Sequence, residues 1–352
     1  MLKTGIVKDP LYLEHITGDY HPESHHRLEV VYEMLAKSDM AGRFVEVKPR
    51  PATREELEYI HTPEYISLVA STAGKSQVML DPDTQTSPKS WEAAQLAAGG
   101  FLELIDQLMQ KKIDNGFALV RPPGHHAEAD RAMGFCLFNN VAIGAKYAIK
   151  KYNLNRILII DWDLHHGNAT QHSFYNDPQV LYFSTHQYPY YPGTGGFNEV
   201  GEGKGKGFTV NVPLSPGPGD EEYAGICLEI LKPVTLEFKP QLILISTGFD
   251  IYFNDPLGGM RVTPEGFARL ARIILELADQ TCQGKALFIL EGGYHLEGLR
   301  DSIRKVLLEL LGESVLFKGR SVLEEKIDSS GVASTIKQAK AALQPFWPGL
   351  SL

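Results

Sequence analysis

The stretch RILIIDWDLHHGN, residues 156–168, indicates where the fold of this chain meets its chemistry. The four aliphatic residues 157–160 show no polar alternation, which is typical of a strand buried on both faces in a parallel sheet. If the extended geometry continues, side chains alternate with a period of two residues, so Asp161, Asp163 and His165 lie on one side. Polar side chains therefore converge where this buried strand ends.

Two carboxylates and an imidazole are costly to bury without a partner, and a divalent metal ion is the simplest partner. The alternative is an Asp that caps the next helix, with surface histidines beside it. The Asp-x-Asp-x-His spacing after an apolar strand favours the metal site. A catalytic zinc ion uses three protein ligands and an open position, so Asp163 and His165 require a third ligand. Asp250 is the candidate because it directly follows another apolar run, 242–249, whereas Asp255 lies farther on in a turn.

Apolar runs and helical patterns alternate along much of the chain. The runs that end in polar segments are GFALV (116–120), ILII (157–160), QVLYF (179–183), QLILIST (241–247) and KALFIL (285–290). Helical patterns at 220–239 and 263–281 separate the later runs, which predicts an α/β protein with a parallel, doubly wound sheet. Ligands bind to such sheets outside the carboxyl ends of the strands, where the candidate functional residues lie.

The amino-terminal part is expected to contribute a strand near 2–7, two short helices within 53–73 and a long helix at 87–111. The pair Gly99 and Gly100 suggests a kink in that long helix. A histidine-rich loop, HPESHHRLEVVYEML at 21–35, suggests a second metal site by its density of imidazoles. Its apolar spacing is more typical of a helix start, which is the favoured interpretation, with Arg27 on the first turn as a candidate cleft residue.

Composition excludes several classes of protein. The 352 residues are 43% hydrophobic and carry a net charge of −9, so they show no basic footprint for nucleic acid. Cys136, Cys227 and Cys282 are widely spaced, which favours neither a disulfide framework nor a cysteine zinc site. No signal peptide and no run of ~20 apolar residues is evident, so we expect a cytoplasmic protein without a membrane partner.

Hydrolysis at a metal site needs a group that accepts a proton from water and later donates one to the leaving group. His125 and His126 follow a stiff Arg-Pro-Pro-Gly turn and are candidates for both tasks. Asp161 and Asn168 are available to accept hydrogen bonds from the imidazoles, the anion raising one pKa and the amide leaving the other lower. Tyr294, after two glycines, is a candidate donor to a developing oxyanion.

These residues lie in six ordered motifs that resemble the histone deacetylase family, including its bacterial acetylpolyamine amidohydrolase and histone-deacetylase-like members. The motifs are PPGHHA (122–127), GFCLFNN (134–140), DWDLHHGN (161–168), STHQYPYYPGTG (184–195), STGFD (246–250) with NDPLGG (254–259), and EGGY (291–294). The resemblance covers about 21–298. It implies a three-layer α/β/α sandwich, arginase-like, around a mainly parallel eight-stranded sheet, and one catalytic domain over 1–352 with a helical tail at about 313–352.

The resemblance assigns roles to six residues: Asp163, His165 and Asp250 bind Zn²⁺, His125 and His126 are the catalytic pair, and Tyr294 is the transition-state donor. It also pairs His125 with Asp161 and His126 with Asn168. One branch of the family has Asp in place of Asn168. The Asn of this chain resembles the second branch, in which the general base is usually assigned to the second histidine.

The resemblance also implies a structural monovalent cation, usually potassium. Its expected ligands are Asp161, Asp163, His165, Ser184 and the carbonyl of Thr185. Phe135 and Tyr191 resemble the walls of a narrow tunnel for an aliphatic stem, with the Gly134 carbonyl near the amide nitrogen. The family's usual second wall is Phe, so the Tyr191 hydroxyl is a departure.

Leu257 occupies the position where polyamine-specific animal members have a glutamate that meets a distal ammonium. An apolar residue there favours lysine-type acyl amides over long acetylpolyamines. Bacterial polyamine hydrolases use other acids, for which Glu14, Glu23 and Asp81 are the candidates in this chain.

We therefore expect a zinc-dependent amidohydrolase that removes acetyl or other acyl groups from lysine-type amines, acting on an acylated lysine peptide or a small acylated amine. Fe²⁺ or Co²⁺ suits the same ligands. The competing hypotheses are an acetylpolyamine deacetylase, a two-manganese arginase-type enzyme, and a non-catalytic acyl-lysine-binding protein. The arginase-type site would need an Asp-x-Asp that 248–259 lacks, and a binding protein would not need Tyr294. The sequence leaves a homo-oligomer open.

Overall fold

The structure, a computed structural model, describes residues 2–18, 20–314 and 321–350. Its centre is an eight-stranded sheet in the order β2-β1-β5-β10-β9-β6-β7-β8, with every neighbouring pair parallel. The strands are β1 (Thr4–Val7), β2 (Val45–Glu46), β5 (Asn115–Ala118), β6 (Ile157–Asp161), β7 (Val180–Gln187), β8 (Thr209–Leu214), β9 (Leu242–Thr247) and β10 (Ala286–Leu290). The predicted parallel sheet with eight strands is confirmed.

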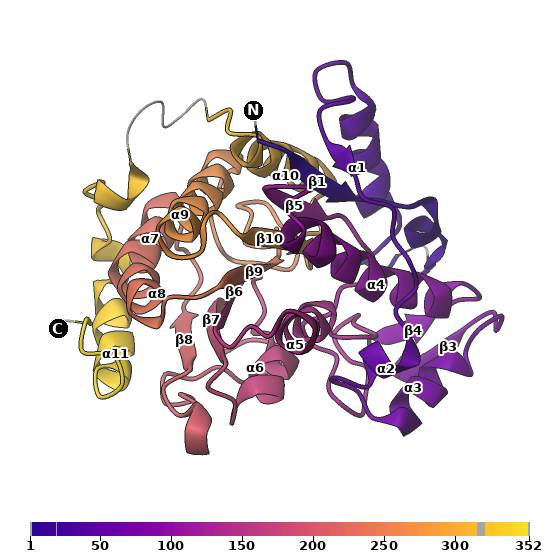
Figure 1. The fold of residues 1–352 in the computed structure, drawn as a ribbon, viewed down its shortest axis with the longest axis horizontal. Helices are drawn as coiled ribbons and strands as arrows, with labels where there is room; N and C mark the ends of the chain where they lie inside the picture. The colour runs from indigo at the N-terminus through magenta and orange to yellow at the C-terminus, as the bar shows by residue number, and fades with distance from the viewer. Residues whose placement is uncertain (1, 19, 315–320, 351–352) are drawn as a thin grey trace.

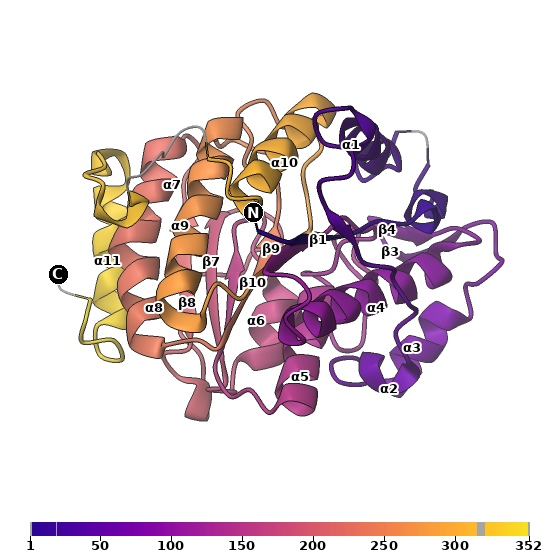
Figure 2. The ribbon, with the colours of Figure 1, turned by 45° about the horizontal axis from the view of Figure 1, so that its top comes forward.

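Helices cover both faces of this sheet. The α-helices of the described residues are α1 (His26–Ala36), α2 (Arg54–Leu57), α3 (Pro63–Ala70), α4 (Ser90–Met109), α5 (Asn140–Tyr152), α6 (Asn168–Phe174), α7 (Asp220–Ile226), α8 (Lys232–Phe238), α9 (Pro264–Cys282), α10 (Leu296–Leu310) and α11 (Ala333–Leu343). Figure 1 and Figure 2 show the sheet between α4, α5 and α6 on one side and α7, α8, α9 and α10 on the other. This is the predicted three-layer α/β/α arrangement.

Burial on both faces explains why the central strands are continuous apolar runs. Every residue of β6, β9 and β10 is buried, because helices pack above and below them. Their apolar side chains belong to a single core cluster that extends from β1 to α11. The polar residues that end these strands are consequently held at fixed positions on one edge of the sheet.

Two local features differ from the sequence-based expectations. The helix expected at 220–239 contains a π-helical turn, Cys227–Leu231, between α7 and α8. A short antiparallel hairpin of β3 (Val78–Asp81) and β4 (Thr84–Thr86) was not predicted, because its strands are too short and polar to show a pattern. Of the helical tail expected at about 313–352, residues 315–320 and 351–352 lie outside the described residues. The described part of the tail contains α11, which packs against the edge strand β8.

No described helix is both long and apolar enough to cross a lipid bilayer. The three cysteines are buried and unpaired, in agreement with the expectation that they form no disulfide framework.

The glycine pair in α4 serves close packing. The helix runs without interruption through Gly99 and Gly100. A Cβ on Gly99 would lie 1.9 Å from the carbonyl oxygen of Arg50 and 2.5 Å from the nitrogen of Ala52, which are backbone atoms that cannot turn aside. The absence of a side chain at Gly99 therefore allows the chain at 50–52 to lie directly on the helix.

This close approach reverses the usual effect of a helical glycine. Replacing a glycine in a helix by alanine ordinarily stabilises the helix by about 1 kcal/mol. We expect Gly99→Ala to lower the thermal unfolding midpoint instead, because the new methyl group must displace backbone. Circular dichroism melting of the variant and the parent protein tests this, and a raised midpoint would contradict the packing.

Candidate functional site

Three predicted metal ligands meet at the carboxyl ends of two neighbouring strands. Asp163 and His165 follow β6, Asp250 follows β9, and the two strands pair directly. All three side chains are buried, and their potential ligand atoms lie within 4.8 Å of one another. His165 Nδ1 is 3.1 Å from Asp163 Oδ1 and 3.1 Å from Asp250 Oδ2. This donor set, with two carboxylates and one imidazole, fits a divalent ion such as zinc.

The electrostatics of this cluster show an unbalanced negative charge. Burial and the neighbouring charge of Asp163 raise the pKa of Asp250 to about 7. Burial lowers the pKa of His165, but hydrogen bonds to Asp163 and Asp250 outweigh it and raise that pKa to about 9. A cation is therefore stabilised here, whether it is a proton on His165 or a metal ion.

Backbone groups hold the two carboxylates in position. Leu164 N donates to Asp250 Oδ1 at 2.8 Å, and Gly292 N donates to Asp163 Oδ2 at 2.8 Å. A Cβ on Gly292 would lie 2.3 Å from Asp250 Oδ2, so only glycine allows this turn to approach the cluster. Among the candidate acids after β9, the structure thus brings Asp250 and not Asp255 to the cluster.

His125 and His126 lie side by side next to the cluster, with ring centres 4.0 Å apart. His125 Nδ1 is 3.0 Å from Asp161 Oδ2, and His126 Nδ1 is 2.7 Å from Asn168 Oδ1. Both pairings expected from the sequence are therefore present as contacts. In each histidine Nδ1 contacts the partner side chain, which leaves Nε2 to accept or donate a proton.

The surroundings of the two histidines shift their pKa values in opposite directions. Burial lowers the pKa of His125, but the charges of Asp161 and Asp163 outweigh it and raise that pKa to about 10. Burial and the charges of His125 and His165 hold the pKa of His126 well below its usual value. At neutral pH His125 is charged and His126 is neutral, which leaves His126 able to accept a proton.

Glu128 fixes the orientation of the Asn168 amide, a feature that the sequence did not reveal. Asn168 Nδ2 donates to Glu128 Oε1 at 2.5 Å, and His172 Nδ1 lies 2.9 Å from the same oxygen. With its NH₂ group on Glu128, the amide presents its oxygen to His126 Nδ1. His126 must then carry its proton on Nδ1 and keep the lone pair on Nε2.

A pocket of about 210 Å³ opens beside His126 and His165. The four residues expected to bind substrate, Gly134, Phe135, Tyr191 and Leu257, all line it. The other lining residues are Asp83, His126, His165, Tyr190 and Tyr294. Phe135 and Tyr294 meet edge to face with ring centres 6.0 Å apart, as do His126 and Tyr191 at 5.2 Å. The pocket is lined largely by aromatic side chains, and one of the potential metal ligands, His165, is among its lining residues.

Two left-handed residues shape one wall of this pocket. Gly134 has φ of +56° and Phe135 has φ of +68°. A Cβ on Gly134 would lie 2.3 Å from His126 Cδ2, so glycine lets the backbone lie against the histidine ring. Asp83, at the tip of the β3–β4 hairpin, accepts a hydrogen bond from Gly134 N at 3.0 Å and so holds this wall.

Tyr294 is held by two supports that the sequence did not predict. Asp255 Oδ2 accepts hydrogen bonds from Tyr294 N at 2.7 Å and from His295 N at 3.2 Å. The Arg27 guanidinium lies 5.1 Å from the centre of the Tyr294 ring and donates to Gly293 O at 2.7 Å. Burial raises the pKa of the Tyr294 phenol, which therefore remains a hydrogen-bond donor.

Arg27 was expected in the cleft and Glu23 was a candidate acid for a substrate amine, but neither residue lines the pocket. Arg27 is buried and does not line the pocket, so it is no open cleft residue. Glu23 is buried in ion pairs with Arg27 and Arg121, which removes it as an acid for a substrate amine. Glu14 and Asp81 do not line the pocket either. Asp83 is the acid that does.

The residues expected around a monovalent cation lie on β6 and β7 and just beyond. Asp161 and Ser184 are partners in the register of these strands. Thr185 is buried, and its Oγ1 has no hydrogen-bond partner among the described residues. Carboxylate, hydroxyl and carbonyl oxygens are suitable ligands for such an ion, so these residues fit one.

Known proteins share both this sequence and this fold. A model of the histone deacetylase domain matches residues 21–310. A probable deacetylase of Archaeoglobus fulgidus is 43% identical over 297 residues, which cover 84% of this chain and 82% of the relative. Human polyamine deacetylase HDAC10 is 39% identical over 338 residues, 92% of this chain and 49% of HDAC10, so the chain spans about half of that relative.

The crystal structure of the HDA15 HD domain matches with a TM-score of 0.91 at 37% identity, covering 99% of this chain and 96% of the other. A domain match over most of the sequence, close relatives and a shared fold agree. The chain belongs to the histone deacetylase family and is a hydrolase of the deacetylase type.

Proposed function

We propose that this protein is a zinc-dependent amidohydrolase that removes acetyl or other acyl groups from lysine-type amines. The observation that carries the proposal is that His126, His165 and Tyr294 line one pocket with aromatic walls. A proton acceptor, a metal ligand and a hydroxyl donor thus meet where an amide bond would lie at the end of an aliphatic stem. When bound, Zn²⁺ supplies a Lewis acid that polarises an amide carbonyl and acidifies water.

Each residue has a defined task in this proposal. His126 Nε2 accepts a proton from the attacking water and returns it to the departing amine. His125, charged against Asp161, stabilises developing negative charge. Tyr294 donates its hydroxyl proton in a hydrogen bond to the oxyanion of the tetrahedral intermediate. We further propose a potassium ion beside Asp161 and the Ser184 and Thr185 oxygens, and a cytoplasmic location remains a prediction.

The aromatic walls and Leu257 support a lysine-type substrate. Phe135 and Tyr191 can enclose an alkyl stem, and an apolar Leu257 at the lining offers no partner to a second ammonium. The second candidate is an acetylpolyamine, favoured by the carboxylate of Asp83 on the same lining. The human relative bears the name of a polyamine deacetylase, which is compatible with this second candidate.

A two-manganese enzyme and a non-catalytic binding protein both have less support. A two-manganese site would need further acidic ligands after β9, but among the described residues the ligand cluster contains Asp163, His165 and Asp250 and does not include Asp255. A non-catalytic acyl-lysine-binding protein would not need His126 or Tyr294 at the pocket. Membership of a deacetylase family also favours turnover.

The Tyr294 hydroxyl provides the first test. We expect Tyr294→Phe to lower kcat by about 10²-fold or more with KM nearly unchanged, because the lost hydrogen bond forms mainly in the transition state. Tyr190→Phe is the matched control, since Tyr190 lines the same pocket but its hydroxyl donates to Leu257 O at 3.0 Å. Equal turnover in Tyr294→Phe and the parent protein would remove the donor from the mechanism.

The identity of the general base is tested by pH dependence. Asn168→Asp places a carboxylate against His126 and raises the His126 pKa, so less neutral base is present at a given pH. The acidic limb of the kcat/KM profile should therefore move to higher pH. The new Asp also adjoins Glu128, and the two acids would share a proton. The double variant with Glu128→Gln should therefore show the larger shift.

Asp161→Asn is the comparison for this experiment, because it removes the charge that faces His125. If the acidic limb stays in place in Asn168→Asp and moves in Asp161→Asn, the base is His125 and the assignment to His126 is wrong.

Substitutions at Leu257 and Asp83 test whether the substrate is an acyl-lysine or an acetylpolyamine. We expect the parent protein to hydrolyse an acetyl-lysine peptide faster than acetylspermidine. Leu257→Glu should raise the turnover of acetylspermidine relative to the acetyl-lysine peptide about two- to fivefold over Leu257→Gln, because one exposed ion pair contributes up to about 1 kcal/mol. A parent protein that prefers acetylspermidine, and loses that preference in Asp83→Asn, would favour the polyamine substrate.

A further inference from the structure

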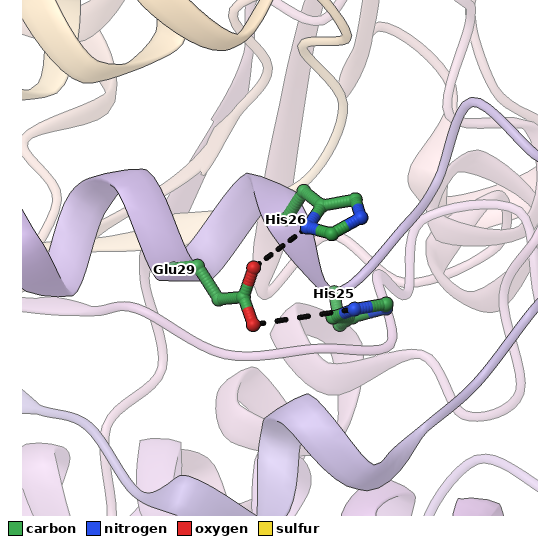
Figure 3. A group of neighbouring side chains, drawn as sticks. All are labelled: His25, His26 and Glu29. Carbon is green, nitrogen blue, oxygen red and sulfur yellow. Dashed lines mark hydrogen bonds and ion pairs between the residues drawn. The ribbon is translucent and has the colours of Figure 1, made fainter. Parts of the chain in front are cut away.

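A second group of possible metal ligands lies at the start of α1, formed by His25, His26 and Glu29. Figure 3 shows both imidazoles on the same side of the helix start, each joined to the Glu29 carboxylate. His26 Nδ1 is 2.6 Å from Glu29 Oε2, and His25 Nε2 is 4.0 Å from Glu29 Oε1. The two rings are tilted by 40° with centres 4.1 Å apart.

The helix start itself creates this arrangement. His25 is the residue that precedes α1, and its side chain makes no capping hydrogen bond. Glu29 follows His26 by three residues and His25 by four, and residues at these spacings share one face of a helix. A carboxylate in the first turn also interacts favourably with the helix dipole. The start of α1, which the sequence predicted, is therefore compatible with an ion-binding site formed by His25, His26 and Glu29.

We propose that His25, His26 and Glu29 bind a divalent transition-metal ion of the zinc type at a site separate from Asp163, His165 and Asp250. Two imidazole nitrogens and a carboxylate oxygen suit zinc, nickel or copper and disfavour calcium and magnesium, which prefer oxygen ligands. Ligand bonds of about 2.0–2.2 Å in a tetrahedral site place ligand atoms roughly 3.3 Å apart. The observed 2.6 Å and 4.0 Å lie on either side of that separation.

Exposure makes this site accessible to an ion and to water. The side chains of His25, His26 and Glu29 are 31%, 58% and 42% exposed. An ion can enter without any opening of the fold, and water can complete its coordination. The ion would join the residue before α1 to its first turn.

The first turn of α1 also carries Arg27, which links it to the catalytic pocket. Arg27 is buried and donates to Glu291 O at 2.5 Å and to Gly293 O at 2.7 Å. These carbonyls belong to the turn that ends in Tyr294. An ion on His25, His26 and Glu29 therefore stabilises the helix turn from which Arg27 supports Tyr294.

The test is a zinc titration of the intact protein, with bound metal measured by elemental analysis after removal of free ions and with thermal unfolding as a second readout. We expect a second zinc ion to bind and to raise the unfolding midpoint. Glu29→Gln and His26→Asn should each lose this second ion and the accompanying stabilisation. Glu33→Gln is the matched control, because it removes an exposed carboxylate one turn farther along α1.

Asp250→Ala separates this proposal from the proposed function. If both sites exist, Asp250→Ala loses one ion and still binds the ion that depends on Glu29. If Asp250→Ala loses nothing while Glu29→Gln loses an ion, the surface site holds and the proposed catalytic site fails. Zinc binding that is the same in Glu29→Gln, His26→Asn and the parent protein would overturn the surface site.

Discussion

Buried negative charge at the carboxyl ends of β6, β9 and β10 is the constraint on which the site depends. Asp161, Asp163, Asp250 and Glu291 are each fully buried within this region. Burial raises the pKa of Glu291 to about 7, although His125 and the backbone N–H of Gly124 oppose that rise. Imidazoles and backbone N–H groups offset part of this negative charge, and the cation of the proposed zinc site would offset more of it.

A second charged network, made of Glu23, Arg27 and Arg121, supports the loops around the first. All three side chains are buried and paired with one another through Glu23. Arg121 also donates to the carbonyls of Tyr12 and His15, and Arg27 donates to those of Glu291 and Gly293. The network thus ties the amino-terminal loop to the turn that holds Tyr294, and loss of either arginine would leave a buried carboxylate without its partner.

The sequence predicted the parts of this site that follow long apolar strands. The run 157–160 has no polar alternation, which predicted a buried strand. Asp163 and His165 were therefore expected at the end of that strand. Asp250 was chosen over Asp255 on the same ground, and the structure brings Asp250 to the cluster. The family motifs supplied the layers of the fold and the number of strands.

The residues that the sequence did not reveal act through contacts with distant segments. Glu128 bonds to the amide of Asn168, 40 residues away, and Asp83 bonds to Gly134 N from a hairpin too short to show a strand pattern. Asp255 was noticed as an acid, but its role in holding the Tyr294 backbone depends on how two loops meet. Such contacts arise from tertiary packing, which local periodicity does not encode.

The most direct test of a zinc-dependent mechanism is the metal content of the purified protein, measured together with hydrolysis of an acetyl-lysine peptide before chelation, after chelation and after zinc is restored. We expect one zinc ion that depends on Asp250, loss of turnover when that ion is removed, and recovery when zinc returns. Full turnover in a metal-free preparation would contradict the mechanism.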